Sequence, residues 1–141
     1  MKQSICAFLG VIGGAIASAF GGWNMALTTL IIFMAVDYFS GLIVAAVFHR
    51  SRKTESGALN SNVGFRGLCK KGMMLLVVLV AARLDMLLGV NFFRDAACIA
   101  LIINELISIA ENAGLMGVPF PAVLSKAIDI LQQKASGEDR T

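Results

Sequence analysis

Long apolar runs separated by short polar breaks dominate the chain, and this pattern predicts helices that cross a membrane. Four such runs can be separated, at 5–22, 25–48, 72–90 and 96–114. Each is close to the roughly 20 residues that a helix needs to cross the hydrocarbon core of a bilayer. The pattern therefore predicts an all-α integral membrane protein with about four transmembrane helices in a single domain, 1–141.

The polar segments between and after these runs predict the orientation. Residues 49–71 form the longest polar loop, with Glu55 as its one acid and six basic residues: Arg50, Arg52, Lys53, Arg66, Lys70 and Lys71. Loops rich in Lys and Arg stay on the cytoplasmic side, so we expect this loop and both termini in the cytoplasm. Residues 121–134 have the spacing of an amphipathic helix that lies on the membrane surface or packs on a partner.

Composition supports the membrane assignment. Hydrophobic residues make up 57% of the chain, charged residues 15%, and the mean hydropathy is +0.79. A soluble domain has about 25% charged residues, so this chain has too few polar groups to cover a water-facing surface. The net charge of +3 is concentrated in one loop, which is typical of an orientation signal and argues against a nucleic-acid-binding face.

Small residues in the first run suggest close helix packing. Gly10, Gly14, Ser18 and Gly22 recur every four residues, and such rows let helix backbones approach each other in lipid. We therefore expect a homo-oligomer that uses this face. A cleaved signal peptide is the alternative, because Lys2, the apolar run and the small residues 17–19 match its three regions.

Charged residues inside the predicted spans need partners. A charge at the bilayer centre costs roughly 2.5 to 3.5 kcal/mol on insertion scales, so Asp37, Arg83, Asp85 and Glu105 should face one another or water. Asp37 lies eleven residues before Phe48, and Arg83 lies eleven residues after Gly72. In antiparallel helices these positions have equal depth, so we predict an ion pair between Asp37 and Arg83.

The fourth run ends in a polar stretch. Its polar residues fall on two adjoining stripes of one helix, and they are Asn104, Glu105, Ser108, Glu111 and Asn112. Two interpretations are open: an ion-pair cluster that sets helix register, or a polar surface that lines water once subunits reassemble. No nucleophile with a base, metal-ligand cluster or phosphate loop is present. We therefore expect no enzyme activity, no cofactor and no metal.

Three stretches together resemble the phage holin family, which includes toxin-secretion holins of the clostridial type. The first is Asp37-Tyr38-Phe39-Ser40-Gly41. The second runs from Asn60 through Ser61, Gly64 and Gly67 to Lys71. The third runs from 104 to 112 and on to Gly117, Pro119 and Pro121. The order and spacing of the stretches, over about residues 35–131, carry the resemblance.

The resemblance implies a multi-span protein that oligomerises in the cytoplasmic membrane of an infected bacterium and opens lesions. An endolysin then reaches the cell wall, or a toxin is released, with no direct contact required. Alternatives are a small transporter or proton channel that uses Asp37 and Glu105 as a relay, and an antiholin-type regulatory subunit, which is also a candidate partner. No internal repeat supports a transporter.

Overall fold

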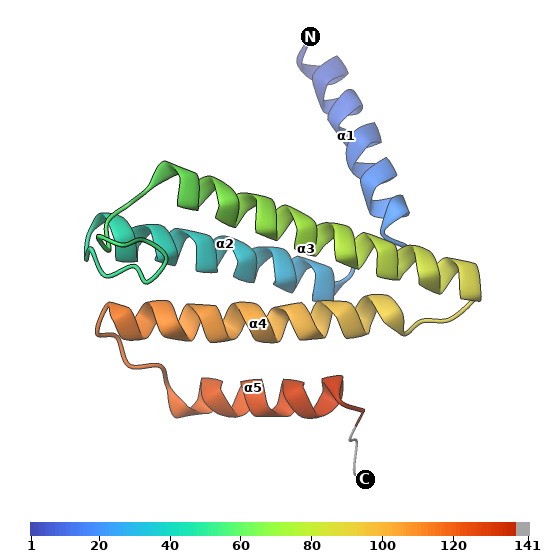
Figure 1. Cartoon of the computed structure of the whole chain (residues 1–141). Helices are drawn as coiled ribbons and strands as arrows, with labels where there is room; N and C mark the ends of the chain where they lie inside the picture. Colours follow the sequence, from blue (N-terminus) through green and yellow to red (C-terminus); the bar gives the residue numbers. More distant parts are fainter. Residues whose placement is uncertain (138–141) are drawn as a thin grey trace.

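The computed structural model describes residues 1–137, and within them all regular secondary structure is α-helical. Its five helices are α1 (Lys2–Ala19), α2 (Met25–Ala46), α3 (Ser61–Leu88), α4 (Phe93–Leu115) and α5 (Ala122–Ala135). Helices α2, α3 and α4 lie side by side, with α3 antiparallel to both neighbours (Figure 1). Helix α5 returns along α4, and α1 projects away from this bundle.

The core lies where α2, α3 and α4 meet. Its buried members come from all three helices, and they are Leu27, Leu30 and Met34 from α2, Met74 and Val78 from α3, and Cys98 and Ile102 from α4. Many large apolar side chains on the outer faces are exposed, such as Ile32, Phe39 and Val80. This distribution fits a bundle whose exterior contacts lipid, because backbone groups are satisfied within the helices and apolar side chains can face outward.

Side chains at the helix ends explain where the elements begin and stop. The Asn24 side chain accepts a hydrogen bond from the Leu27 amide at 2.9 Å, and Asn60 accepts from the amides of Asn62 and Val63. Asparagine is a favoured N-cap because its oxygen satisfies amides that have no partner inside the helix. Helix α3 ends at Gly89, whose left-handed conformation (φ 66°) is typical of a C-terminal glycine.

Two predicted boundaries shift in the structure. Helix α3 starts at Ser61 and not near 72, because Asn60 caps it, so residues 61–71 of the predicted loop are helical. Helix α1 ends at Ala19, and Gly22 lies beyond it with φ 94°. Gly22 is therefore a turn residue, so only Gly10, Gly14 and Ser18 of the predicted packing row lie in α1.

Helices α1 and α2 are the two in residues 1–137 with the length and apolar composition needed to cross a membrane. Helix α1 buries no residue, and no atom lies within 4 Å of a Cβ placed on Gly10 or Gly14. Apart from a few contacts with α3, its apolar faces therefore have no partner within the described chain. Helix α5 packs on α4, and its Leu131 packs against the core cluster.

Candidate functional site

Lys71 is the centre of a buried polar cluster that joins three helices. Its Nζ atom lies 2.7 Å from Asp37 Oδ2 on α2 and 2.6 Å from Glu105 Oε2 on α4. Asp37 is 6% exposed and Glu105 is 2% exposed. Both carboxylates are therefore withdrawn from solvent, and the same ammonium group bridges them.

Asn112 completes this cluster on the α4 side. Its Nδ2 atom donates to the Asp37 carbonyl at 3.1 Å, to Asp37 Oδ1 at 3.0 Å and to Ser40 Oγ at 2.8 Å. Across the described residues, every buried side-chain nitrogen and oxygen atom has a hydrogen-bond partner. We call Asp37, Ser40, Lys71, Glu105 and Asn112 the polar network.

The charged side chains of the polar network depend on one another, because each is largely buried. Two carboxylates and one ammonium are held together away from water, where an unpaired charge costs several kcal/mol. Each carboxylate depends on Lys71, and Asp37 also depends on Asn112. Removing Lys71 or Asn112 therefore leaves a buried carboxylate oxygen without its donor, which costs more than the net worth of the lost hydrogen bond.

The predicted pair between Asp37 and Arg83 is wrong. Asp37 lies nine residues before the end of α2 at Ala46, and Lys71 lies ten residues after the start of α3 at Ser61. Depth must be counted from these helix ends, not from the borders of the apolar runs, and this count places Lys71 opposite Asp37. Arg83 is exposed and donates to Met86 Sδ at 3.3 Å, and no carboxylate in the described chain pairs with it.

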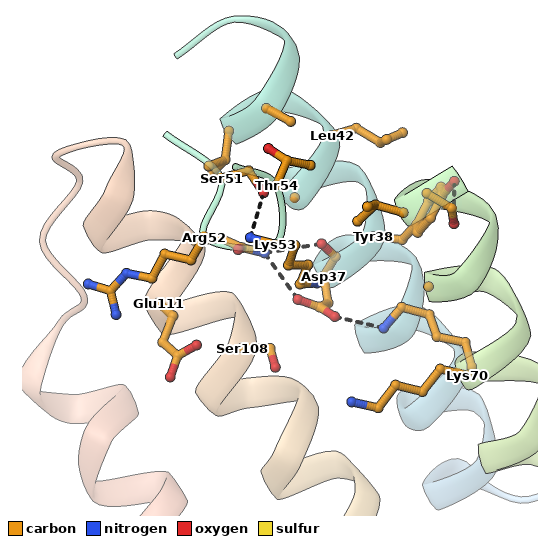
Figure 2. A pocket seen from close by; sticks show the side chains of 18 of the residues that line it. Asp37, Tyr38, Leu42, Ser51, Arg52, Lys53, Thr54, Lys70, Ser108 and Glu111 are labelled. Atoms are coloured by element: carbon orange, nitrogen blue, oxygen red, sulfur yellow. Dashed lines mark hydrogen bonds and ion pairs between the residues drawn. The ribbon is translucent and has the colours of Figure 1, made fainter. Parts of the chain in front are cut away.

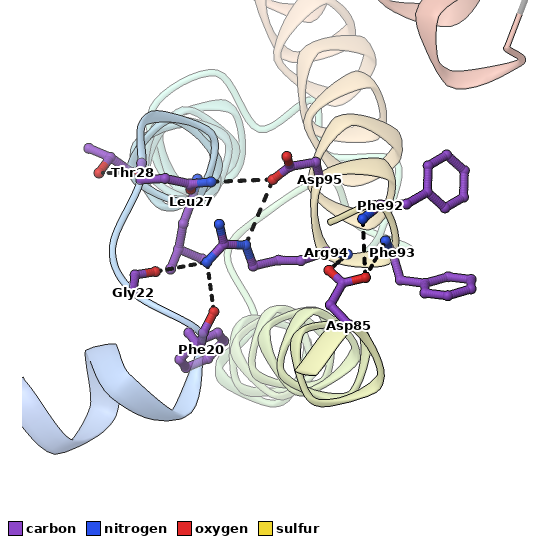
Figure 3. Close-up of polar contacts among 10 residues, drawn as sticks. Phe20, Gly22, Leu27, Thr28, Asp85, Phe92, Phe93, Arg94 and Asp95 are labelled. Carbon is purple, nitrogen blue, oxygen red and sulfur yellow. Dashed lines mark hydrogen bonds and ion pairs between the residues drawn. The ribbon is translucent and has the colours of Figure 1, made fainter. Parts of the chain in front are cut away.

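Asp85 also lies outside the polar network, at the other end of the bundle (Figure 3). Its carboxylate accepts from the backbone amides of Phe92, Phe93 and Arg94 at 3.2, 2.8 and 2.9 Å. These are the free amides at the start of α4, so Asp85 caps that helix from α3. The predicted intramembrane pairing role of Asp85 is replaced by this capping role.

Arg94 holds the turn between α1 and α2 at this same end. Its Nη1 atom donates to the carbonyls of Phe20 and Gly22 at 2.8 and 2.9 Å (Figure 3). Asn24 donates to Asp95 Oδ1 at 3.3 Å. Sequence reasoning had assigned no role to Arg94, because its acceptors are backbone carbonyls of a distant turn.

Sequence reasoning also missed Lys71, which it counted as a loop charge. A signal was present, because Gly64, Gly67, Lys71, Met74 and Val78 recur at intervals of three and four. This spacing marks one face of a helix, and it places Lys71 in line with the buried Met74 and Val78. Continuing the helical pattern back from the apolar run would have placed the lysine on the core face.

A cavity of about 190 Å³ lies beside the polar network, between the loop and the adjoining ends of α2, α3 and α4 (Figure 2). It gathers residues from all three motif stretches: Asp37, Asn60, Gly64, Gly67, Asn104, Glu105, Ser108, Glu111 and Asn112. Tyr38 lies against these two glycines, and its hydroxyl donates to the Gly64 carbonyl at 3.5 Å. The motifs are thus parts of one site.

Other residues singled out in the sequence lie elsewhere. Ser61 is the first residue of α3, and Gly117 lies in the turn after α4 with φ 79°. Pro119 lies in the link that follows, and Pro121 caps α5. They shape the connections around the cavity and do not line it.

The chemistry of the site is that of charge pairing and hydrogen bonding. In the part of the chain that the structure describes, no group of three or more His, Cys, Asp or Glu side chains is placed to hold a metal ion. Cys98 is buried in the core, whereas Cys6 and Cys69 are exposed. The arrangement can stabilise one packing of α2, α3 and α4, and it can present polar groups if these helices separate.

Comparison with known proteins agrees with this architecture. The model of the bacteriophage holin family matches residues 14–133. An uncharacterized protein of Clostridium perfringens is 41% identical, with 92% of this chain and 93% of that protein aligned. An uncharacterized protein of Listeria monocytogenes is 39% identical, with 92% of this chain and 89% of that protein aligned.

A more distant relative has a functional name. The "probable holin" of Bacillus phage phi105 is 28% identical, with 81% of this chain and 82% of that protein aligned. No solved structure matches the chain. The family match covers all three motif stretches, the polar network and the cavity. The chain therefore belongs to the bacteriophage holin family and is a holin-like membrane protein.

Proposed function

We propose that this protein oligomerises in the bacterial cytoplasmic membrane and opens lesions that release an endolysin or a toxin. The observation that carries this proposal is the polar network, which lies inside a small helical bundle with an apolar exterior. A transmembrane bundle with only apolar side chains would have nothing to line a water-filled opening. In this bundle the charged side chains are largely buried between α2, α3 and α4, and they would line an opening if these helices separated.

The resting state and the lesion would differ in what the polar network faces. In the compact bundle, Lys71 pairs with both Asp37 and Glu105 at close range, which lowers the cost of holding these charges away from water. If α3 and α4 moved apart within an oligomer, the same side chains, together with Asn104 and Ser108, would form a polar wall. Water would then replace the intramolecular partners, and the cost of exposing the charges would be low.

The proposed topology has four crossings, formed by α1, α2 and the apolar parts of α3 and α4. The basic residues before and at the start of α3 favour a cytoplasmic location for that end. Both termini are then cytoplasmic, and Asp85 and Arg94 lie at the outer end. Helix α5 shields one side of α4, so its release would uncover an α4 face for another subunit.

Helix α1 is the best candidate for contacts between subunits. Its large apolar side chains are exposed, among them Phe8, Leu9 and Val11. Gly10 and Gly14 leave a flat strip with nothing against it. In lipid, helices associate by close packing along such strips, so a second copy of α1 fits this face.

Inducible expression in a bacterial host tests the proposal. Expression of the full chain should stop growth abruptly, collapse the membrane potential and release a co-expressed endolysin. An endolysin expressed alone should stay inside the cells and is the matched control. If expression leaves the potential intact and delays lysis by another holin, the protein is an antiholin and the lesion proposal fails.

A further inference from the structure

Three basic side chains on the rim of the cavity are not used by the polar network. Arg52, Lys53 and Lys70 line the cavity, and all three residues are exposed. None of them pairs with a carboxylate in residues 1–137, where Lys71 and Arg94 make the salt bridges. In Figure 2, Arg52 and Lys53 come from the loop and Lys70 comes from α3, and the Arg52 guanidinium extends away from Asp37, on the side where Glu111 lies. This rim is therefore free to bind a ligand.

The charge balance of the cavity favours an anion. Three carboxylates line it, but Lys71 already pairs with Asp37 and Glu105. Counted together, four cations and three carboxylates line the cavity, a formal balance of +1, and Glu111 is the one carboxylate outside the polar network. A guanidinium group such as that of Arg52 binds phosphate oxygens in a bidentate manner, and the hydroxyl group of Ser51 is a further donor on the same wall.

The remaining wall of the cavity is apolar. Leu42, Ala45, Leu59 and Leu115 line it beside the charged rim. A free phosphate ion would leave this wall without a partner, whereas a phosphate attached to a hydrocarbon group would contact both parts. The cavity volume of about 190 Å³ is several times the ~30 Å³ that a water molecule occupies in the liquid, so it can admit part of a headgroup.

We propose that this cavity binds the headgroup of an anionic phospholipid from the cytoplasmic leaflet. Arg52 and Lys53 bind the phosphate, and Lys70 adds positive charge from α3. The inference rests on the proposed function, which places this end of the bundle at the cytoplasmic membrane surface. The ligand would lie in the cavity that four residues of the polar network line, namely Asp37, Lys71, Glu105 and Asn112.

The loop that carries Arg52 and Lys53 has a defined shape. The Ser51 amide donates to the Gly57 carbonyl at 3.0 Å, and Thr54 Oγ1 donates to the Ala58 carbonyl at 2.9 Å. Gly57 has φ 74°, and a Cβ there would collide with the His49 carbonyl. The basic side chains are therefore presented by an organised turn, which lowers the entropic cost of binding.

Lipid binding to the full-length protein in detergent tests this inference. Dioctanoyl phosphatidylglycerol and dioctanoyl phosphatidylcholine are titrated separately, and the bound lipid is counted by native mass spectrometry. The anionic lipid should bind at least fivefold more tightly, and R52Q/K53Q should remove most of this preference. The matched control is R50Q/R66Q, because Arg50 and Arg66 carry equal charge in the same region but do not line the cavity.

Three outcomes would overturn the inference. Equal loss of binding in both double variants would mean that diffuse surface charge attracts the lipid. Competition by sn-glycerol 3-phosphate at the same concentration as the short-chain lipid would make the ligand a soluble phosphate. The variant R52K/K53R keeps both positive charges. If it loses binding as completely as R52Q/K53Q does, with an unchanged helical circular dichroism spectrum, positive charge at these positions is not what binds the lipid.

The lipid site and the lesion can fail separately. Collapse of the membrane potential by wild-type protein without any lipid preference would overturn the lipid site alone. If the protein shows a lipid preference that depends on Arg52 and Lys53 but never depolarises cells, only the proposal of lesion formation is overturned.

Discussion

Replacing Lys71 with Gln should destabilise the packed bundle more than any other single charge removal in the chain. Lys71 bridges two buried carboxylates at 2.7 and 2.6 Å, and its own side chain is 14% exposed. Breaking a buried ion pair by removing one partner costs roughly 3 to 5 kcal/mol. Because two carboxylates lose the same ammonium partner, the upper part of this range is expected.

This energy corresponds to a roughly 100- to 5000-fold shift toward separated helices, since about 1.4 kcal/mol is a factor of ten. The assay is the reversible unfolding of the detergent-solubilised protein in a denaturant series, with lysis timing in cells as a second readout. Lys70→Gln is the matched control, because Lys70 is the exposed neighbour and makes no ion pair in the described chain.

A triple variant separates charge pairing from side-chain packing. Combining Lys71→Gln with Asp37→Asn and Glu105→Gln leaves no orphan charge, so it should be more stable than Lys71→Gln alone. If Arg83→Gln destabilises the protein as much as Lys71→Gln does, the assignment of the partner is refuted. Additive effects of Lys71→Gln and Asp37→Asn would also refute it.

Four other predictions follow from the remaining contacts and the topology. Asn112→Leu should cost about 1 to 3 kcal/mol of unfolding free energy, because the Asp37 carboxylate loses a buried donor, and Asn104→Leu at an exposed position is its control. Asp85→Ala should cost roughly 0.5 to 2 kcal/mol through loss of the α4 cap, measured by denaturant unfolding, with hydrogen exchange fastest at residues 92–94. Gly14→Leu should delay or abolish lysis while membrane insertion stays intact, and unchanged crosslinked ladders would contradict this. A reporter fused after Thr141 should be active only in the cytoplasm, and activity outside would refute the four-span topology.

The sequence alone was enough to indicate the membrane class, because that property follows from composition and run length. The all-helical fold and the family assignment are confirmed, and the family match covers the motif stretches on which the resemblance rested. Local signals also predict elements: the apolar spacing of 121–134 predicts the helix found at Ala122–Ala135. Four crossings and the oligomer stay predictions.

Partner choice in the polar network could not be read from the sequence. The expected pair of Asp37 with Arg83 used the borders of apolar runs as a measure of depth. The border of a run marks where lipid ends, whereas a helix continues until its hydrogen-bonding pattern is broken. Because Asn60 caps α3, the helix begins at Ser61, eleven residues before the expected span. This offset brings Lys71, and not Arg83, to the depth of Asp37.

The roles of Asp85 and Arg94 depended on tertiary structure for a different reason. Both side chains bind backbone groups, namely the amides of 92–94 and the carbonyls of Phe20 and Gly22. Every residue carries such groups, so no sequence pattern marks which of them will be reached. Composition and periodicity determine that the helices form and what surrounds them, whereas their register in space decides which charges meet, because hydrogen bonds and ion pairs act only over a few ångströms.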